Sequence, residues 1–332
     1  MTLQQLRGMC AVVECAYNVS RAAEALHTSQ PAISKMIRLI EEEIRTALFI
    51  RARGRIVGLT EMGTDVLALA QRILQDVKAV SDISAERFNQ KSGVLKIGTT
   101  HLHARYALLK VIKEFRRDYP DVHLHLTLGN PQQILEWVSK GDVQLGICTL
   151  SRHIPENVFS LPAYPIERCI ITPLQHPLLR KRRISFKDIA KYPLIAYDSL
   201  FNSGWVVEAE FEKRGLTPLI AMKATDANVI KAYVAAGLGV SIFQKMALDK
   251  DKNVGVIDMP HLLPSSVTYI NLRQGQYLRN FQYEFISRLT PKWDRQSIEA
   301  QTDTDRKINP SAIPVRRGDA PGAGVEPVPD CV

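Results

Sequence analysis

The chain of 332 residues lacks any apolar run close to the roughly 18 residues that cross a membrane, so no transmembrane helix is expected. Its N-terminus carries Glu14 where a signal peptide would be uniformly apolar, which argues against export. The five cysteines form an odd set without a C-x-x-C pair, so a disulfide framework and a cysteine zinc site are both unexpected. These absences favour a cytoplasmic protein without a membrane partner.

Motifs of catalysis are also missing. The chain has no G-x-S-x-G, P-loop or H-E-x-x-H motif, and no recognisable Ser/His/Asp set. Gly237 and Gly239 resemble the start of a dinucleotide fingerprint, but they precede a predicted strand instead of a helix. His123 and His125 share a strand face, yet no carboxylate or cysteine has the spacing to complete a metal site. We expect no cofactor, no metal and no catalytic residue; an α/β enzyme with an incidental N-terminal domain remains the alternative.

Positive charge is in excess. Lys and Arg number 43 against 34 Asp and Glu, which gives a net charge of +9 and favours an anionic partner. Residues 1–60 contain no Asp and hold eight Lys or Arg against five Glu. Hydrophobic residues make up 45% of the chain, enough for folded cores, and its length suits two or three domains.

Composition divides the chain into four parts. Residues 1–60 show short helical patterns, and residues 61–90 contain no Pro and one Gly, as in one long helix. Residues 91–292 alternate β-branched runs with helical patterns, which is typical of βαβ units. Residues 293–332 form a tail whose last part, from Asn309 onwards, holds five Pro and three Gly. We expect this tail to be disordered.

The first part has the pattern of a helix-turn-helix. Apolar residues recur at helical spacing over 3–13, and Ser20 is the expected N-cap of a short second helix over 21–27. A third helix restarts at Thr28-Ser29, with Pro31 in its first turn. Its exposed face holds Gln, Ser, Lys and Arg, which suit base edges and phosphates, and a hairpin with a cation at every second position follows. An ordinary three-helix domain with a solvated face is the alternative.

The residues expected to contact double-stranded DNA lie at the start of the second helix, on the third helix and the turn before it, or in the hairpin: Ser20, Thr28, Ser29, Gln30, Pro31, Ser34, Lys35, Arg38, Arg51, Arg53 and Arg55.

The long helix carries a narrow apolar stripe with alternating steps of four and three, interrupted at Asp76. The stripe consists of Met62, Val66, Leu69, Ile73, Val80 and Ile83. A stripe this narrow cannot form a core alone, so it predicts pairing with a second copy, as a dimer that reads two half-sites. Packing of this helix onto its own domain is the alternative.

The third part predicts two doubly wound α/β halves with a cleft between them. The expected strands are 94–99, 122–128, 143–148, 169–172, 194–197, 219–221, 239–243 and 267–272. Polar segments follow three of them, at 99–101, 148–149 and 199–204. Ligands of open α/β sheets bind at such strand ends, beside helix N-termini. Hydroxyls and backbone N–H groups from two halves suit a small anion or zwitterion without a buried cation, although helix capping would also explain them.

Several motifs resemble LysR-type transcriptional regulators. They are Leu3-Gln4-Gln5-Leu6, Ala22-Ala23-x-x-Leu26-x-x-Ser29-Gln30-Pro31-Ala32-Ile33-Ser34, Leu48-Phe49-x-Arg51 and Leu59-Thr60-x-x-Gly63. This resemblance implies a winged helix-turn-helix, a linker helix that pairs two chains into a dimer or tetramer, and a periplasmic-binding-protein-like effector domain of two subdomains. Where the family ends the recognition helix with glycine, this chain has Arg45. A left-handed cap there costs on the order of 1 kcal/mol, so we expect the helix to end differently or to continue.

The second half is similar to the CysB branch of that family. The similarity lies in Thr99-Thr100-His101-x-x-Ala104-Arg105-Tyr106-Ala107-Leu108, Ala224-Thr225-Asp226-Ala227-x-Val229-Ile230-Lys231-x-Tyr233-Val234 and Gly237-Leu238-Gly239-Val240. The resemblance implies control of sulfur-assimilation, sulfonate-use or cysteine-biosynthesis genes, an effector such as sulfate, thiosulfate or an acetylserine, and RNA polymerase as a further partner. A LysR-type regulator of an unrelated catabolic pathway is the alternative.

The effector-binding residues that follow are Thr99, Thr100, His101, Leu102, His103, Thr149, Asn202, Ser203 and Thr225. Three of them depart from the branch, which has a hydroxyl residue and a glutamine at Leu102 and His103 and another hydroxyl at Asn202. An apolar group and a titratable imidazole in place of two neutral hydrogen-bonding groups argue against plain sulfate. We expect a bulkier anion, such as an organic sulfonate or an amino-acid derivative.

Overall fold

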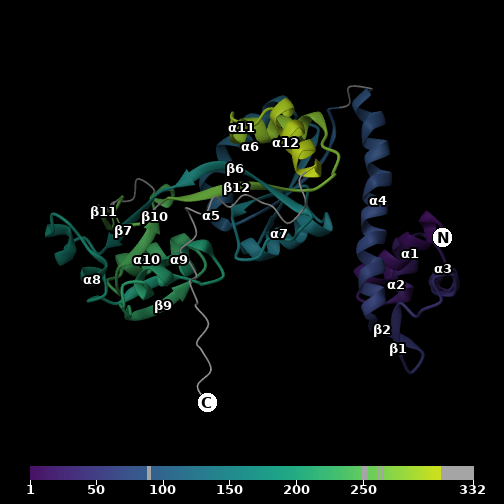
Figure 1. Ribbon diagram of the computed structural model, residues 1–332, viewed down its shortest axis with the longest axis horizontal. Helices are drawn as coiled ribbons and strands as arrows, with labels where there is room; N and C mark the ends of the chain where they lie inside the picture. The colour runs from purple at the N-terminus through teal and green to yellow at the C-terminus, as the bar shows by residue number, and fades with distance from the viewer. Residues whose placement is uncertain (88–90, 249–252, 261, 264, 308–332) are drawn as a thin grey trace, which may run out of the picture.

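The computed structural model describes residues 1–87, 91–248, 253–260, 262–263 and 265–307. A helical N-terminal domain is joined by one long helix to an α/β domain of two subdomains (Figure 1). Among the described residues, no helix combines the length and apolarity needed to span a membrane.

The N-terminal domain is a three-helix unit followed by a hairpin. Its elements are α1 (Leu3–Glu14), α2 (Val19–Ala25), α3 (Gln30–Ile44), β1 (Phe49–Ala52) and β2 (Arg55–Leu59). Ala22 and Ala23 are buried on α2 and let it pack closely against α1 and α3, whose buried faces include Met9 and Ile37. The expected helix-turn-helix with a wing is therefore present.

Two helix ends differ from expectation. Asn18, and not Ser20, caps α2, because its side chain accepts the Arg21 N–H at 3.1 Å; Ser20 lies inside the helix. The helix α3 does end at Arg45 with a left-handed cap (φ 59°), so the expectation that it would end otherwise is wrong. The Arg45 N–H and the Thr46 N–H both donate to the Glu41 carbonyl, so local backbone hydrogen bonds close the helix in this left-handed conformation.

The long helix α4 (Glu61–Arg87) starts from a fixed turn. Thr60 Oγ1 donates to the Ala47 carbonyl at 2.8 Å and accepts the Gly63 N–H at 3.0 Å. A Cβ at Gly63 would lie 2.0 Å from the Leu48 carbonyl oxygen, so only glycine fits where α4 crosses the hairpin. These contacts fix the direction in which α4 leaves the N-terminal domain.

One face of α4 packs on the N-terminal core, through Val66, Leu67, Ala70 and Leu74. Farther along, Gln75 Nε2 donates to the Lys140 carbonyl of the α/β domain at 2.6 Å. The rest of the predicted stripe is exposed in the single chain: Met62, Leu69, Ile73, Val80 and Ile83. Val66 thus belongs to the domain core instead of the open stripe.

Subdomain I is built on one five-stranded sheet in the order β4-β3-β5-β12-β6. Its strands are β3 (Gly93–Thr99), β4 (Val122–Leu128), β5 (Leu145–Thr149), β6 (Val158–Ile166) and β12 (Ser266–Arg273). Its helices are α5 (His101–Tyr106), α6 (Leu108–Asp118), α7 (Pro131–Lys140), α11 (Asn280–Leu289) and α12 (Arg295–Lys307). The main core lies between this sheet and α6 and α11, where Phe115 meets Phe285 edge to face at 5.3 Å.

Subdomain II contains two small sheets, β10-β7-β11 and β8-β9. Its strands are β7 (Arg168–Thr172), β8 (Leu194–Tyr197), β9 (Ile220–Ala224), β10 (Ser241–Gln244) and β11 (Gly255–Asp258). Its helices are α8 (Phe186–Ile189), α9 (Asn202–Glu212) and α10 (Ala227–Ala235), with 3-10 turns at Pro177–Arg180 and Lys245–Ala247. The Ile195 N–H donates to the Val240 carbonyl at 2.9 Å and joins β8 to β10. Both β6 and β12 run from subdomain I toward subdomain II (Figure 1).

All eight predicted strands appear, with ends shifted by a few residues, but two further strands were not predicted. One of them, β6, contains Pro162 and Pro165, which are unfavourable in a central strand but are tolerated here because β6 lies at the edge of its sheet. The short β11 is likewise an edge strand.

The tail is ordered farther than expected. Residues 295–307 form α12, and Ile298 is buried in the main core of subdomain I. Trp293 Nε1 donates to the Pro162 carbonyl at 2.8 Å and anchors the start of this helix. The expectation of disorder from residue 293 is thus wrong for this part, and residues 308–332 lie outside the described residues.

Candidate DNA interface and effector cleft

Every residue expected to contact DNA is exposed on the N-terminal domain. Ser29 caps α3 by accepting the Ala32 N–H at 3.4 Å, and Pro31 occupies the first turn, as expected. Gln30, Ser34, Lys35 and Arg38 follow on the outer face of α3. Because Ile33, Ile37 and Ile40 hold the opposite face in the core, this outer face is fixed in direction.

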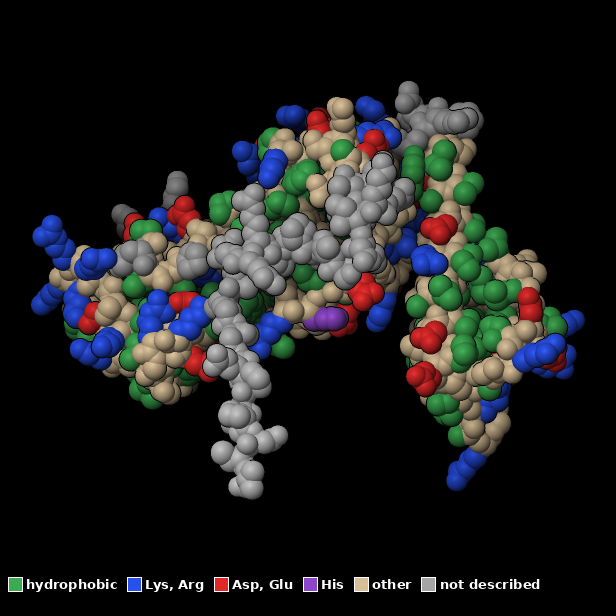
Figure 2. All heavy atoms as spheres, viewed as in Figure 1, with side chains coloured by type: hydrophobic (Ala, Val, Ile, Leu, Met, Phe, Trp, Pro, Cys, Tyr) green, Lys and Arg blue, Asp and Glu red, His purple; other side chains and the backbone are tan. Residues whose placement is uncertain are grey.

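The hairpin of β1 and β2 forms the wing. Arg53 (φ 49°) and Gly54 (φ 75°) make its two-residue turn, a left-handed pair that matches the twist of the strands. Arginine side chains, blue in Figure 2, project from the tip of this hairpin. Arg53 and Arg55 are therefore placed to reach a phosphate backbone beside the groove that α3 would enter.

Arg51, which was expected to contact DNA, is paired with a carboxylate of its own domain. Glu41 on α3 accepts two hydrogen bonds from the Arg51 guanidinium, at 3.1 and 2.7 Å, and two from the N–H groups of Leu48 and Phe49, at 2.9 and 3.2 Å. Burial raises the pKa of Glu41, but these hydrogen bonds outweigh it and lower the pKa below its usual value. The carboxylate thus fastens the wing to the end of the recognition helix.

A cleft of about 420 Å³, partly open to solvent, lies between the two subdomains. Its lining comprises Thr100, His101, Leu102, His103, Thr149, Ile166, Tyr197, Phe201, Asn202, Ser203, Thr225, Ala227 and Gln244. Three helix N-termini meet there, those of α5, α9 and α10. Helix N-termini carry unpaired N–H groups and partial positive charge, which stabilise an anion.

All but one of the predicted effector residues line this cleft. The exception is Thr99, whose Oγ1 donates to the Ile147 carbonyl at 2.8 Å in the core and joins β3 to β5. Thr100 is the N-cap of α5, as the capping alternative proposed, and accepts the His103 N–H at 3.5 Å. Its hydroxyl hydrogen is left for another acceptor, so capping and ligand binding are compatible.

The α9 end of the cleft supplies further donors. Among the described residues, no side chain caps α9 at its N-cap, Phe201, so the N–H groups of the cleft-lining residues Asn202 and Ser203 stay open to a ligand. Asn202 Oδ1 accepts from Arg168 Nη2 at 3.3 Å and from Ser266 Oγ at 2.6 Å. Because arginine can only donate, the atom facing Arg168 is the amide oxygen, which leaves Nδ2 as a donor.

Arg168 is a buried cation directly behind Asn202, although the sequence-based interpretation required none. Burial lowers the pKa of this guanidinium to about 10, so it stays charged at neutral pH. Arg168 also donates to Ser266 Oγ, on the crossing strand β12. Its positive charge adds to the field that favours an anion in the cleft.

His103 is fully enclosed in this cleft. Burial lowers the pKa of its imidazole to about 4, and its Nδ1 lies 3.0 Å from the Tyr164 hydroxyl. The ring is therefore neutral at physiological pH and hydrogen-bonds much as an amide would. The expected contrast between a titratable imidazole and a neutral glutamine thus disappears, whereas Leu102 remains apolar and packs toward the core of subdomain II.

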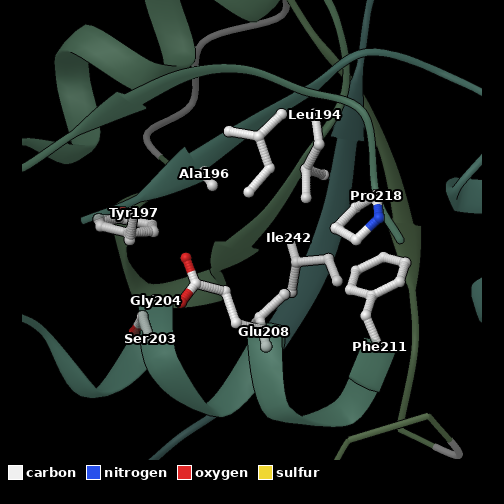
Figure 3. A pocket seen from close by; sticks show the side chains of 11 residues that line it. Leu194, Ala196, Tyr197, Ser203, Gly204, Glu208, Phe211, Pro218 and Ile242 are labelled. Atoms are coloured by element: carbon white, nitrogen blue, oxygen red, sulfur yellow. The ribbon is translucent and has the colours of Figure 1, made fainter. Parts of the chain in front are cut away.

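Sequence reasoning missed five lining residues: Ile166, Tyr197, Phe201, Ala227 and Gln244. Tyr197 ends β8 and Gln244 ends β10, so the rule that ligands bind at strand ends could have found both. Tyr197 and Ser203 also border a second, mostly apolar pocket of about 310 Å³ between α9 and strands β8 and β10 (Figure 3). No group of three His, Cys, Asp or Glu in the described part of the chain could hold a metal ion.

Comparisons with known proteins agree with this architecture. Residues 3–64 match the bacterial regulatory helix-turn-helix model of the lysR family, and residues 88–294 match the LysR substrate binding domain. The chain is 38% identical over 301 residues to the HTH-type transcriptional regulator CysB of Burkholderia cenocepacia, covering 90% of this chain and 96% of that protein. It is 36% identical over 300 residues to the regulator SsuR of the same organism, with 90% and 97% covered.

A solved structure is similar as well. The crystal structure of the cofactor-binding domain of the Cbl transcriptional regulator has a TM-score of 0.61 and 31% identity, over 64% of this chain and 93% of that one. The chain therefore belongs to the LysR family. It is a CysB-like, DNA-binding transcriptional regulator with an effector-binding domain, and not an enzyme.

Proposed function

We propose that this regulator controls genes of sulfur or sulfonate assimilation, or of cysteine biosynthesis, in response to a small anionic effector bound in the cleft. The observation that carries the proposal is the meeting of three helix N-termini with the Thr100 and Asn202 donors and the Arg168 charge. Such a set of donors stabilises a sulfonate or sulfate through several hydrogen bonds at once. The similarity to CysB and SsuR supports the choice of pathway.

The effector class is tested by isothermal titration of the full-length protein with sulfate, thiosulfate, acetylserine and a panel of alkane sulfonates. Because Leu102 adds apolar surface to the cleft, we expect at least one organic sulfonate or amino-acid derivative to bind more tightly than sulfate. Thr149→Val, which removes a hydroxyl at the end of β5, should weaken every anion in the panel. Tight sulfate binding without any response to sulfonates would contradict this effector class.

The DNA contacts are tested by replacing Lys35 and Arg38 with alanine. Both side chains are exposed on α3, so the fold should remain intact while the shift of a promoter fragment is lost. Two fewer phosphate contacts should also flatten the dependence of affinity on salt, by about 0.9 per contact in the logarithmic slope. Effector binding by the same variant, measured by titration, provides the control. A variant that loses self-association instead would show that this face serves another purpose.

Self-association through α4 is part of the proposal. The exposed apolar stripe has no cover from the described residues of its own chain, and hydrophobic side chains gather along α4 (Figure 2). Val80 is 68% exposed, so Val80→Lys costs the single chain little and should act only on the assembly. Sedimentation should show a shift toward monomer at micromolar concentration, whereas Lys78→Ala, on the same turn, should not. If Val80→Lys left the proportions of monomer and larger species unchanged, α4 would be excluded as the interface.

Effector binding would act by closing the cleft. The crossing strands β6 and β12 join the subdomains, and Tyr106 Oη on α5 donates to Asn228 Oδ1 on α10 at 2.8 Å. A ligand held from both walls binds the closed arrangement more tightly and shifts the population toward it. Paired effector domains would then sit differently and change the spacing of the two DNA-binding domains, and with it contact to RNA polymerase. Small-angle scattering with and without effector measures this change.

A further inference from the structure

Two polar atoms in the cleft are not used by the anion site described above. Tyr197 is 5% exposed and Gln244 is 3% exposed, and both side chains line the cleft. Within the part of the chain that the structure describes, neither Tyr197 Oη nor Gln244 Oε1 has a hydrogen-bond partner. Buried polar atoms are nearly always paired, so a ligand bound in this cleft would meet two atoms that are free to hydrogen-bond with it.

The bonding around Gln244 defines the chemistry it offers. Its Nε2 donates to Ser203 Oγ in the first turn of α9, which leaves Oε1 as a pure acceptor. An acceptor oxygen repels the oxygens of a sulfonate or carboxylate. The ligand group that meets Gln244 is therefore a hydrogen-bond donor and not part of the anionic head.

The surroundings of Tyr197 favour a positive charge. Burial, and then the nearby Asp226 carboxylate, raise the pKa of Tyr197 well above its ordinary value, so its hydroxyl stays neutral. Asp226 itself accepts the N–H groups of Asn228 and Val229, at 2.8 and 3.2 Å, as the N-cap of α10, and is held in place. A neutral hydroxyl beside a fixed carboxylate accepts readily from an ammonium group.

The rest of the cleft has the opposite preference. Thr100, Asn202 and the open N–H groups of α9 are donors, with the Arg168 charge behind them. One cleft thus combines donors for an anionic head with acceptors for a cationic group.

We propose that Tyr197 and Gln244 form a second subsite that binds the ammonium group of a zwitterionic effector, a short aminoalkane sulfonate. This inference rests on the proposed function, because the sulfonate head would occupy the anion site of the same cleft. The two side chains then determine specificity: they select zwitterions over simple sulfonates of equal length.

A matched series of ligands tests the subsite. Titration of the full-length protein with 2-aminoethanesulfonate, 2-hydroxyethanesulfonate and ethanesulfonate keeps the head and length constant and changes only the end group. We expect the amino compound to bind at least tenfold more tightly than ethanesulfonate, with the hydroxy compound between them. Equal affinities, or tightest binding of the hydroxy compound, would overturn the assignment of an ammonium site.

Variants then assign the selectivity to these residues. Tyr197→Phe and Gln244→Leu should each reduce the affinity ratio of the amino compound to ethanesulfonate by about tenfold. Gln244→Leu also removes the hydrogen bond to Ser203 Oγ, so only Tyr197→Phe should leave ethanesulfonate affinity unchanged. That unchanged affinity also shows that the variant is folded. Tyr283→Phe, at a hydroxyl that donates to Glu299 on α12 far from the cleft, is the matched control and should alter no affinity.

The outcomes separate the two proposals. If ethanesulfonate binds and Thr149→Val weakens it, but Tyr197→Phe and Gln244→Leu leave the ratio of affinities as it is, the anion site stands and the ammonium subsite is refuted. If no sulfonate binds the wild-type protein, both the subsite and the proposed effector class are refuted.

Discussion

Removal of the Glu41 side chain should loosen the wing from the recognition helix. Glu41 is 13% exposed and accepts four hydrogen bonds, two of them from the N–H groups of Leu48 and Phe49. The Arg51 pair contributes little, since the Arg51 side chain is 43% exposed and screened by water. The two N–H bonds to a carboxylate are worth about 1.5 kcal/mol each, so Glu41→Ala should destabilise the N-terminal domain by about 3 kcal/mol.

Glu42→Ala is the matched control, one residue along the same helix. Glu42 is exposed and pairs with Arg38, at 3.4 Å, in a surface ion pair worth about 0.5 kcal/mol or less. Both variants remove one negative charge near the DNA face, so simple electrostatics would tighten DNA binding equally. We expect Glu42→Ala to follow that trend and Glu41→Ala to bind DNA more weakly, because its wing is no longer held.

Hydrogen exchange of the full-length protein measures the difference. A loss of about 3 kcal/mol corresponds to roughly 100-fold faster exchange of the most protected amides in residues 3–60. The reasoning would be refuted if the two variants lost protection equally, or if Glu41→Ala kept the exchange rate of the wild type. Low pH offers a second test: the lowered pKa of Glu41 gives stability above its ordinary pKa of 4.5, which is lost as pH falls through the folded-state value.

Three further predictions concern single side chains. Arg45→Gly should stabilise the N-terminal domain by about 0.5–1 kcal/mol in hydrogen exchange, because glycine relieves the left-handed cap; no gain would mean that the cap carries no strain. Burial lowers the pKa of His103 from its ordinary 6.5 to about 4. As the pH decreases from 6.5 to 4, the unfolded chain therefore binds a proton that the folded chain does not, and the free energy of unfolding of the effector domain should decrease by about 3 kcal/mol. His103→Gln should remove this pH dependence of the free energy of unfolding, measured by urea unfolding with tryptophan fluorescence. An unchanged pH dependence in the variant would show that another group causes it. Ile298→Ala should cost the same domain about 2–4 kcal/mol, whereas a disordered tail would show no change.

Local patterns in the sequence were sufficient for much of this molecule. The stripe of Ile33, Ile37 and Ile40, the Ser29 cap and Pro31 predict α3 without any other part of the chain. The strand and helix alternation predicts two α/β halves, and hydroxyls at strand ends predict Thr100 and Thr149 as cleft residues. These features depend on residues within a few positions of one another, so they can be recognised from the linear sequence alone.

Tertiary contacts decided the remainder. The strand order of the five-stranded sheet places β6 at its edge, where Pro162 and Pro165 are tolerated. Ile298 of α12 is buried because this helix packs against the main core of subdomain I. Arg168 reaches Asn202 and Ser266 only because β7, α9 and β12 meet at the junction of the subdomains. No spacing in the sequence predicts which side chains stay unpaired in a cleft, because pairing depends on how distant segments are placed, as with Gln244 and Ser203, which lie 41 residues apart.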